Sequence, residues 1–323
     1  MNEFFAWYKL LHVKGLGDKS ARILLQRLKE KDMSVEEVFD LSEKAFAELV
    51  PEFGKGRLSR IRYAHFHELD EERIEDSWEQ LQQCGIRLVP ATAEAYPSAL
   101  ASRLKDEAPL VLFCKGNLNL LGADSVAIVG SRHADEATLQ LTKDIAAALA
   151  GEGLNVVSGY AKGVDTWAHT GALAADGTTT AVLSEGLFHL SEKKEFADIP
   201  AWERNALFVS QFLPVTRWAA RNAMMRNKVV VGLSKGVVVM ASGPERDAKG
   251  RMSGTFQAAR TAMEKEVPVF VLDPASMAQP PAGNAELIAR GACAFSSPQA
   301  LIELVHQSKP KSAAKPTQLS LFD

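Results

Sequence analysis

Residues 86 to about 306 alternate short apolar runs with longer segments of helical periodicity. The runs are rich in β-branched residues and apolar almost throughout, as in strands that are covered on both faces. This alternation predicts an α/β fold with a Rossmann-like, doubly wound and mainly parallel sheet. The predicted strands are 86–89, 110–114, 125–129, 154–158, 179–183, 237–240 and 267–272, and the predicted helices are 136–151, 164–175, 221–233, 255–265 and 284–290.

The first 85 residues predict a small all-helical domain in front of the sheet, with apolar residues at helical spacing. Within it, residues 13–21 followed by ILLQRL have the form of a helix–hairpin–helix motif. The motif's glycine turn would direct backbone N–H groups at a DNA phosphate, with Gly15, Gly17 and Lys19 as candidates. Residues 51–64 resemble a second, degenerate hairpin. The alternative is a helical bundle that serves as a cap or a protein contact.

Composition sets limits on location and on ligands. Of the 323 residues, 46% are hydrophobic and 24% charged, which is ordinary for a soluble globular protein. No apolar run is long enough for a membrane span, and the N-terminus lacks a signal-peptide pattern, so we expect a cytoplasmic protein. The three cysteines are scattered, so we expect reduced thiols and no metal, and without a P-loop motif we expect no nucleotide cofactor. Because the net charge is -3, any affinity for nucleic acid has to come from a local groove.

Four loops are predicted at the carboxyl ends of the strands, where open α/β sheets bind ligands. Glycine and serine let the backbone approach a phosphate, and arginine and lysine supply positive charge. Several such sites in a row suit a polymer better than a single nucleotide. The loops carry Gly130-Ser131-Arg132, then Ser158-Gly159 with Lys162-Gly163, then Arg226-Asn227-Lys228, and finally Ser253-Gly254-Thr255.

Over residues 86–295 the chain resembles the DprA/Smf family of DNA-processing proteins. The similar segments occur in the family's order, and several of them contain the loops above. They are Tyr96-Pro97-Ser98-Ala99-Leu100, Gly116-Asn117-Leu118, VAIVGSR (126–132), SGYAKGVDTWAH (158–169), RNKVVVGLS (226–234), SGTFQAA (253–259) and GNAELIARGA (283–292).

The resemblance implies a homodimer that binds single-stranded DNA and delivers it to a RecA-type recombinase, in natural transformation or related DNA processing. It also implies that Arg132, Lys162, Arg226, Asn227 and the 253–255 turn face the DNA. Lys228, Met224 with Met225, Phe188 and the segment 188–220 depart from the family pattern and mark a divergent member. Lys228 stands where the family has arginine, and residues 188–220 lack the family's Tyr-Pro-x-x-Asn.

Catalysis is not predicted. His169 and Asp165 are interpreted as residues that fix the loop and the helix start, since no nucleophile–base pair, carboxylate pair or metal cluster accompanies them. One alternative is a nucleotide sensor or nucleotide-sugar hydrolase of the related phosphoribohydrolases, which carry Pro-Gly-Gly-x-Gly-Thr-x-x-Glu. Here Ala258 stands where the glutamate would act, which argues against hydrolysis but not against sensing. Another alternative is a phage- or plasmid-defence variant of DprA.

The last residues form a separate candidate site. Residues 307–323 are rich in Pro, Lys, Ser and Ala, so we expect a flexible tail. The segment Gln318-Leu319-Ser320-Leu321-Phe322 resembles the motif that binds the bacterial β sliding clamp. Leu321 and Phe322 would enter an apolar pocket and Gln318 would set the register.

Overall fold

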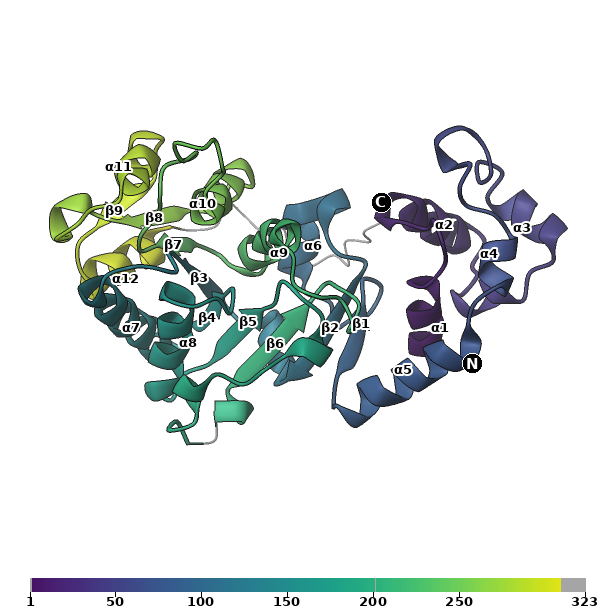
Figure 1. Cartoon of the computed structure of the whole chain (residues 1–323), viewed down its shortest axis with the longest axis horizontal. Coiled ribbons are helices and arrows are strands. Elements are labelled where there is room, and N and C mark those ends of the chain that lie inside the picture. The colour runs from purple at the N-terminus through teal and green to yellow at the C-terminus, as the bar shows by residue number, and fades with distance from the viewer. Residues whose placement is uncertain (1, 201, 309–323) are drawn as a thin grey trace.

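The computed structural model describes residues 2–200 and 202–308. Its centre is a nine-stranded sheet in the order β1-β2-β6-β5-β4-β3-β7-β8-β9 (Figure 1). The strands from β6 to β9 along this order are parallel, whereas β1 pairs with β2 and β2 with β6 in the antiparallel sense. Their bounds are β1 Arg87–Pro90, β2 Val111–Gly116, β3 Ser125–Val129, β4 Asn155–Ser158, β5 Thr179–Val182, β6 Ala206–Ser210, β7 Val237–Val239, β8 Val269–Leu272 and β9 Cys293–Phe295. The predicted fold class, a mainly parallel doubly wound sheet, is therefore confirmed.

Helices cover both faces of the sheet, because the buried strands present apolar side chains alternately to each face. Ala127 and Val129 of β3 belong to the core beneath α6, α9, α10 and α11, whereas Val126 and Ile128 belong to the core beneath α7, α8 and α12. The helices are α6 Ser98–Leu104, α7 Glu136–Gly151, α8 Val164–Ala174, α9 Ala220–Leu233, α10 Gly254–Glu264, α11 Ala282–Ala289 and α12 Pro298–Gln307.

Four elements of the sheet region were not predicted from the sequence. They are the strands β6 and β9 and the helices α6 and α12, all of them short. Strand β6 follows a segment whose sequence has no clear periodicity. Because β6 lies between β2 and β5, it joins the antiparallel β1–β2 pair to the parallel part of the sheet. Among the described residues, no helix is both long and apolar enough to cross a membrane.

The N-terminal region is helical, as predicted, and packs against the β1–β2 end of the sheet (Figure 1). Tyr8 places its ring edge-on to Phe113 of β2, with the ring centroids 6.2 Å apart. Arg22 donates a hydrogen bond to the carbonyl oxygen of Ala108 just before that strand. The helices are α1 Glu3–Leu10, α2 Asp18–Glu30, α3 Glu43–Leu49, α4 Ala64–His67 and α5 Glu71–Gln83.

Candidate nucleic-acid interface

The strand order brings three of the predicted phosphate-binding turns to one edge of the sheet. Strand β3 lies between β4 and β7 and is parallel to both, so the turns that follow these strands emerge side by side. We call this the carboxyl edge and define it as residues 130–132, 159–163 and 253–255. The turn after β3 leads into a short loop before α7, the turn after β4 leads directly into α8, and the third turn begins α10.

The turns after β3 and β4 are locked together by backbone contacts. The amide of Val164 donates to the carbonyl oxygen of Ser131 over 3.2 Å. Gly163 has a φ of +73°, and a Cβ atom at this position would lie 2.6 Å from that same carbonyl oxygen. No residue with a side chain fits here without displacing the neighbouring turn. The side chains of Arg132 and Lys162 are left exposed, one on each turn.

Arg226 lies in a helix, which confirms the predicted helix 221–233 and shows that the assignment of Arg226-Asn227-Lys228 to a loop was wrong. The stretch Arg226-Asn227-Lys228 lies inside α9, because the helical pattern from 220 to 233 continues through it. The Arg226 side chain is nevertheless directed at the carboxyl edge. A Cβ atom on Gly159 would come within 1.3 Å of its Nη1 atom, so the guanidinium lies directly against the turn after β4.

The guanidinium of Arg226 is buried, and its ion pair and hydrogen bonds are incomplete. The residue is only 6% exposed, and its Nη1 atom is 3.9 Å from Oδ2 of Asp165, an ion pair too long for a hydrogen bond. Its Nε atom is buried without a hydrogen-bond partner among the described residues. Burial raises the pKa of Asp165, and the positive charge of Arg226 opposes that rise. A guanidinium in this state retains donor capacity for an anion at the turn above it.

The next two residues of α9 are directed elsewhere. Asn227 is buried and donates to the carbonyl oxygen of Gly254 over 3.0 Å, so it braces the first turn of α10. Lys228 forms an ion pair with Glu107, which Lys265 also contacts at 2.6 Å. These two lysines lower the pKa of Glu107 to about 2. The structure therefore does not bring Lys228 together with the turns of the carboxyl edge.

Several other candidate residues serve the architecture. The Ser158 side chain is fully buried and donates to the carbonyl oxygen of Ile128 over 2.6 Å. Asp165 accepts a hydrogen bond from the amide of Ala161, which fixes the turn after β4. Ser253 caps α10 by accepting a hydrogen bond from the amide of Phe256.

His169 is also internal to the fold. It is fully buried, and its Nδ1 atom lies 2.6 Å from the hydroxyl of Thr179. Because that hydroxyl donates to the Val156 carbonyl oxygen, the histidine Nδ1–H must be the donor of the pair. The Nε2 atom is then an unprotonated acceptor, buried and without a hydrogen-bond partner in the described part of the chain. Burial lowers the pKa of His169 to about 3.

Trp218 was missed by the sequence analysis. It precedes α9, is 52% exposed, and holds its ring 6.0 Å from the Arg132 guanidinium carbon. The available signal was an Arg-Trp pair, Arg217-Trp218, directly before a helix that carries further basic residues. An exposed aromatic ring beside a cation at this edge is suited to stack on a base.

The N-terminal hairpin has the predicted form. Gly15 has a φ of +83° in the turn between α1 and α2, and a Cβ atom there would lie 2.9 Å from the carbonyl oxygen of Arg60. The two glycine hairpins of this region therefore touch. Gly17 precedes α2 and exchanges hydrogen bonds with Ser20, while Lys19 is exposed. The clamp-binding-like residues Gln318, Leu319, Leu321 and Phe322 lie outside the described residues.

Comparison with known proteins gives a consistent result. Residues 87–306 match the sequence profile of the family described as DNA recombination-mediator protein A. The chain is 30% identical to the DNA processing protein DprA of Bacillus subtilis (strain 168) over 221 residues, which cover 68% of this chain and 71% of the relative. It is 33% identical to protein Smf of Escherichia coli (strain K12) over 71% of this chain and 59% of that relative.

Two solved structures share the fold. The X-ray structure of DprA from Streptococcus pneumoniae superposes with a TM-score of 0.75 and 26% identity, over 94% of this chain and 98% of the other. The structure of DNA processing protein A from Helicobacter pylori, described for its single-stranded DNA binding mode, gives a TM-score of 0.57 and 28% identity over 70% of this chain and 97% of the other. The chain therefore belongs to the DprA/Smf family of DNA-processing proteins.

Proposed function

We propose that this protein binds single-stranded DNA along the carboxyl edge, holding the strand by its phosphates. The observation that carries the proposal is the convergence of the turns after β4, β3 and β7 on one edge, with Arg132 and Lys162 exposed there. The buried guanidinium of Arg226 adds a third positive charge beneath the turn after β4. That the Helicobacter pylori relative is described as binding single-stranded DNA supports the same ligand.

Local charge makes this binding compatible with a net charge of -3. Glu245, the acidic residue whose carbonyl oxygen accepts from the amide of Ser253, is held by Arg260 and Arg290, each at 2.8 Å. Its charge is thus balanced within the fold. The charged side chains on the glycine turns themselves, Arg132 and Lys162, are both basic and exposed, which favours a polyanion there.

The proposal extends to the role implied by the family resemblance. A protein that holds a single strand by its phosphates leaves the bases accessible to a second protein. We therefore propose that this protein is a recombination mediator that supplies DNA to a RecA-type recombinase during DNA uptake or processing. We further propose that it acts in the cytoplasm as a homodimer. It needs no cofactor and no catalytic residue for this role. The divisions 1–85, 86–306 and 307–323 would then serve as a helical domain, a DNA-binding domain and a tail.

The alternative function, nucleotide sensing or nucleotide-sugar hydrolysis, predicts a different binding profile. Ala258, which stands where the phosphoribohydrolases have the catalytic glutamate, is a buried residue of α10 and is 1% exposed. A binding assay with single-stranded DNA, duplex DNA and a mononucleotide in parallel separates the two functions. DNA-strand binding predicts the tightest affinity for single-stranded DNA and a steep loss as salt rises. Salt-insensitive binding of the mononucleotide alone would establish the alternative.

A second partner is proposed for the C-terminal segment. Residues 318–322, QLSLF, carry three large apolar side chains behind a stretch rich in Lys and Pro, and such a segment suits an apolar pocket on a partner. We propose the β sliding clamp as that partner. Deletion of 318–323 should abolish binding to purified clamp while single-stranded DNA binding persists. Unchanged clamp binding after the deletion would exclude the motif.

A further inference from the structure

The connection from β7 to α10 carries a folded hairpin just before the turn 253–255. The connection spans residues 240–253 and is much longer than those that follow β3 and β4. In Figure 1 it is the loop that lies beside α10. Arg246 and Met252 form an antiparallel bridge, and the amide of Asp247 donates to the carbonyl oxygen of Arg251 over 2.9 Å. We call residues 246–252 the basic hairpin.

The basic hairpin is held in one conformation by its own polar groups. The Asp247 carboxylate accepts hydrogen bonds from the amides of Lys249 and Arg251, each over 2.9 Å, and pairs with the Arg251 guanidinium at 2.7 Å. Gly250 has a φ of +74°, which lets the chain reverse at the tip, and a Cβ atom there would meet no atom within 4 Å. The tip therefore faces open space on a preformed turn.

The base of the basic hairpin is joined to the carboxyl edge. The amide of Ser253 donates to the carbonyl oxygen of Glu245 over 3.1 Å, directly below the bridge between Arg246 and Met252. Ser253 also caps α10, so the hairpin and the third turn of the edge share this residue. Since a strand rises about 3.3 Å per residue, the tip of the hairpin lies about 10 Å beyond that turn.

Arg246 and Lys249 supply the unbalanced positive charge of the basic hairpin. Both side chains are exposed, and the Arg246 guanidinium donates to the carbonyl oxygen of Gly250 over 2.9 Å. Neither cation forms an ion pair with an acidic side chain in the described part of the chain. The two acidic residues nearby, Glu245 and Asp247, are each paired with arginine. The hairpin therefore presents two cations that can meet an external anion.

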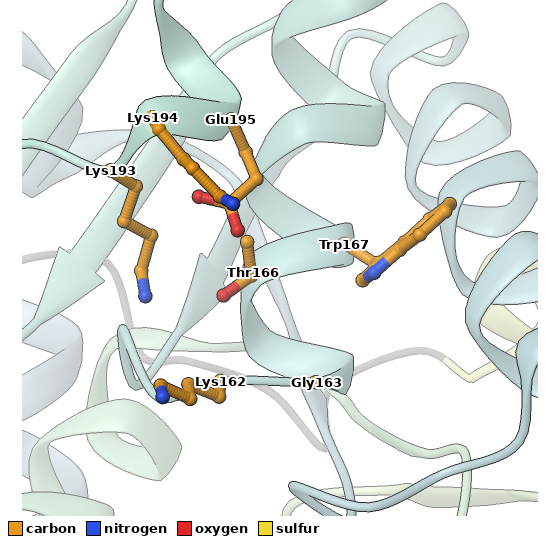
Figure 2. A pocket seen from close by; sticks show the side chains of 7 residues that line it. All are labelled: Lys162, Gly163, Thr166, Trp167, Lys193, Lys194 and Glu195. Carbon is orange, nitrogen blue, oxygen red and sulfur yellow. The ribbon is translucent and has the colours of Figure 1, made fainter.

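The strand order places the basic hairpin at one end of a row of cations. Strands β4, β3 and β7 are neighbours in that order. Figure 2 shows Lys162 on the turn after β4, where it lines a cavity together with Lys193 of the connection from β5 to β6. Arg132 follows β3, and the hairpin follows β7. Because neighbouring strands are about 4.8 Å apart, a polymer that passes from Lys162 over Arg132 next meets the base of the hairpin.

We propose that the basic hairpin extends the DNA path beyond the turn 253–255, with Arg246 and Lys249 each contacting a phosphate of the same single strand. The inference rests on the proposed function and adds a contact surface outside the three turns of the carboxyl edge. Two charge-assisted contacts on a preformed arm cost little conformational entropy when the strand binds.

The test compares Arg246→Gln/Lys249→Gln with Arg87→Gln/Lys115→Gln as the matched control. Arg87 of β1 and Lys115 of β2 are exposed and lie at the opposite edge of the sheet, at the amino ends of the parallel strands. Affinity for oligothymidylates of graded length is measured across a salt series. For the longer oligomers the hairpin variant should have a salt slope smaller by about 1.4, since each phosphate contact to a single strand contributes about 0.7. This difference from the control should shrink as the oligomer is shortened.

Two single variants separate a phosphate contact from a structural role. Lys249→Glu reverses the charge of an exposed side chain and should weaken binding further than Lys249→Gln. Arg246→Lys retains the charge and should retain the salt slope, even though it removes the bond to the Gly250 carbonyl oxygen. A loss in Arg246→Lys equal to that in Arg246→Gln would show that Arg246 acts only by holding the hairpin, which overturns its phosphate contact.

The outcomes separate this inference from the proposed function. If replacement of Arg132 and Lys162 lowers the salt slope but the hairpin variant matches its control, the hairpin contact is overturned and the proposed function stands. If the hairpin variant lowers the slope and replacement of Arg132 and Lys162 does not, the hairpin contact stands and the carboxyl edge fails as the DNA site. An equal loss of slope for duplex DNA of the same length would overturn the assignment to a single strand.

Discussion

The guanidinium of Arg226 lies against Gly159, so close that a Cβ atom on the glycine would come within 1.3 Å of the Arg226 Nη1 atom. The glycine and the arginine therefore form one unit, in which the absence of a side chain on one residue creates the space for the charge of the other. The neighbouring Asn227 braces a different turn, the one that begins α10. Helix α9 thus supports two turns of the carboxyl edge with two consecutive side chains.

Replacement of Gly159 tests this unit. We expect Gly159→Ala to displace the buried guanidinium and to lower the free energy of unfolding by about 1 to 3 kcal/mol, the usual cost of overpacking. The measurement is chemical denaturation, with Gly254→Ala as the matched control. The nearest atom to a Cβ at Gly254 is 3.9 Å away, which is ordinary contact. Equal stability of the two variants would show that Arg226 is not held in this position.

Trp218 should contribute to DNA affinity through stacking. We expect Trp218→Ala to weaken single-stranded DNA binding by about 1 to 3 kcal/mol, because aromatic–base stacking is worth that much per base. Trp218→Phe keeps an aromatic face and should retain much of the affinity. The salt slope should change little in either variant, since no charge is lost. A Trp218→Ala variant with wild-type affinity would mean that no base reaches this ring.

Lys228 should differ from Lys162 in its effect on DNA binding, although both belong to segments that resemble the family. The Lys228 ammonium is engaged with Glu107, whereas the Lys162 side chain is exposed at the carboxyl edge. Lys162→Ala should reduce the salt slope by about 0.7, the contribution of one phosphate contact, and Lys228→Ala should leave it unchanged. Equal reductions in the two variants would place Lys228 on the DNA path.

The buried His169 should make the free energy of unfolding fall as the pH is lowered below 6.5. Its pKa is about 3 in the folded protein, below the ordinary value of 6.5 for the unfolded chain. Above pH 6.5 the imidazole is neutral in both states. As the pH falls from 6.5 toward 3, only the unfolded state takes up the proton, so stability is lost at up to about 1.4 kcal/mol per pH unit.

The measurement is the free energy of unfolding at several pH values between 7 and 4. His169→Gln should remove this part of the slope, whereas replacement of the exposed His133 by glutamine should not. An identical pH dependence of stability in wild type and His169→Gln would contradict the buried neutral histidine.

The elements that could be predicted from the sequence were those with strong hydrophobic periodicity. The strand SVAIV and the helix from 136 to 151 were expected where they occur, because β-branched runs and long helical repeats carry strong periodic signals. Strand β9 was not expected, since its three residues include two exposed ones and show no pattern of burial. Strand β6 follows the irregular residues 187–205, and its pairing with β2 is a long-range property of the sheet.

The candidate site was predictable in its turns but not in its side-chain roles. The turns after β3 and β4 could be predicted from a glycine with a basic residue close behind it, because the conformation of a glycine turn depends mainly on its own residues. The burial of Arg226 and the pairing of Lys228 with Glu107 depend on how α9 packs against distant elements. Trp218 and Lys193 lie in segments without periodicity, so only the folded chain shows that they adjoin the carboxyl edge.

Arg132 and Lys162 are proposed to hold the phosphates of a single DNA strand at the carboxyl edge. The most direct measurement is the salt dependence of single-stranded DNA affinity for wild type and for Arg132→Ala/Lys162→Ala. We predict that the double variant binds all sequences more weakly, and that its slope of log K against log salt is smaller by about 1.4, the value for two lost phosphate contacts. A double variant with the wild-type affinity and slope would contradict the account.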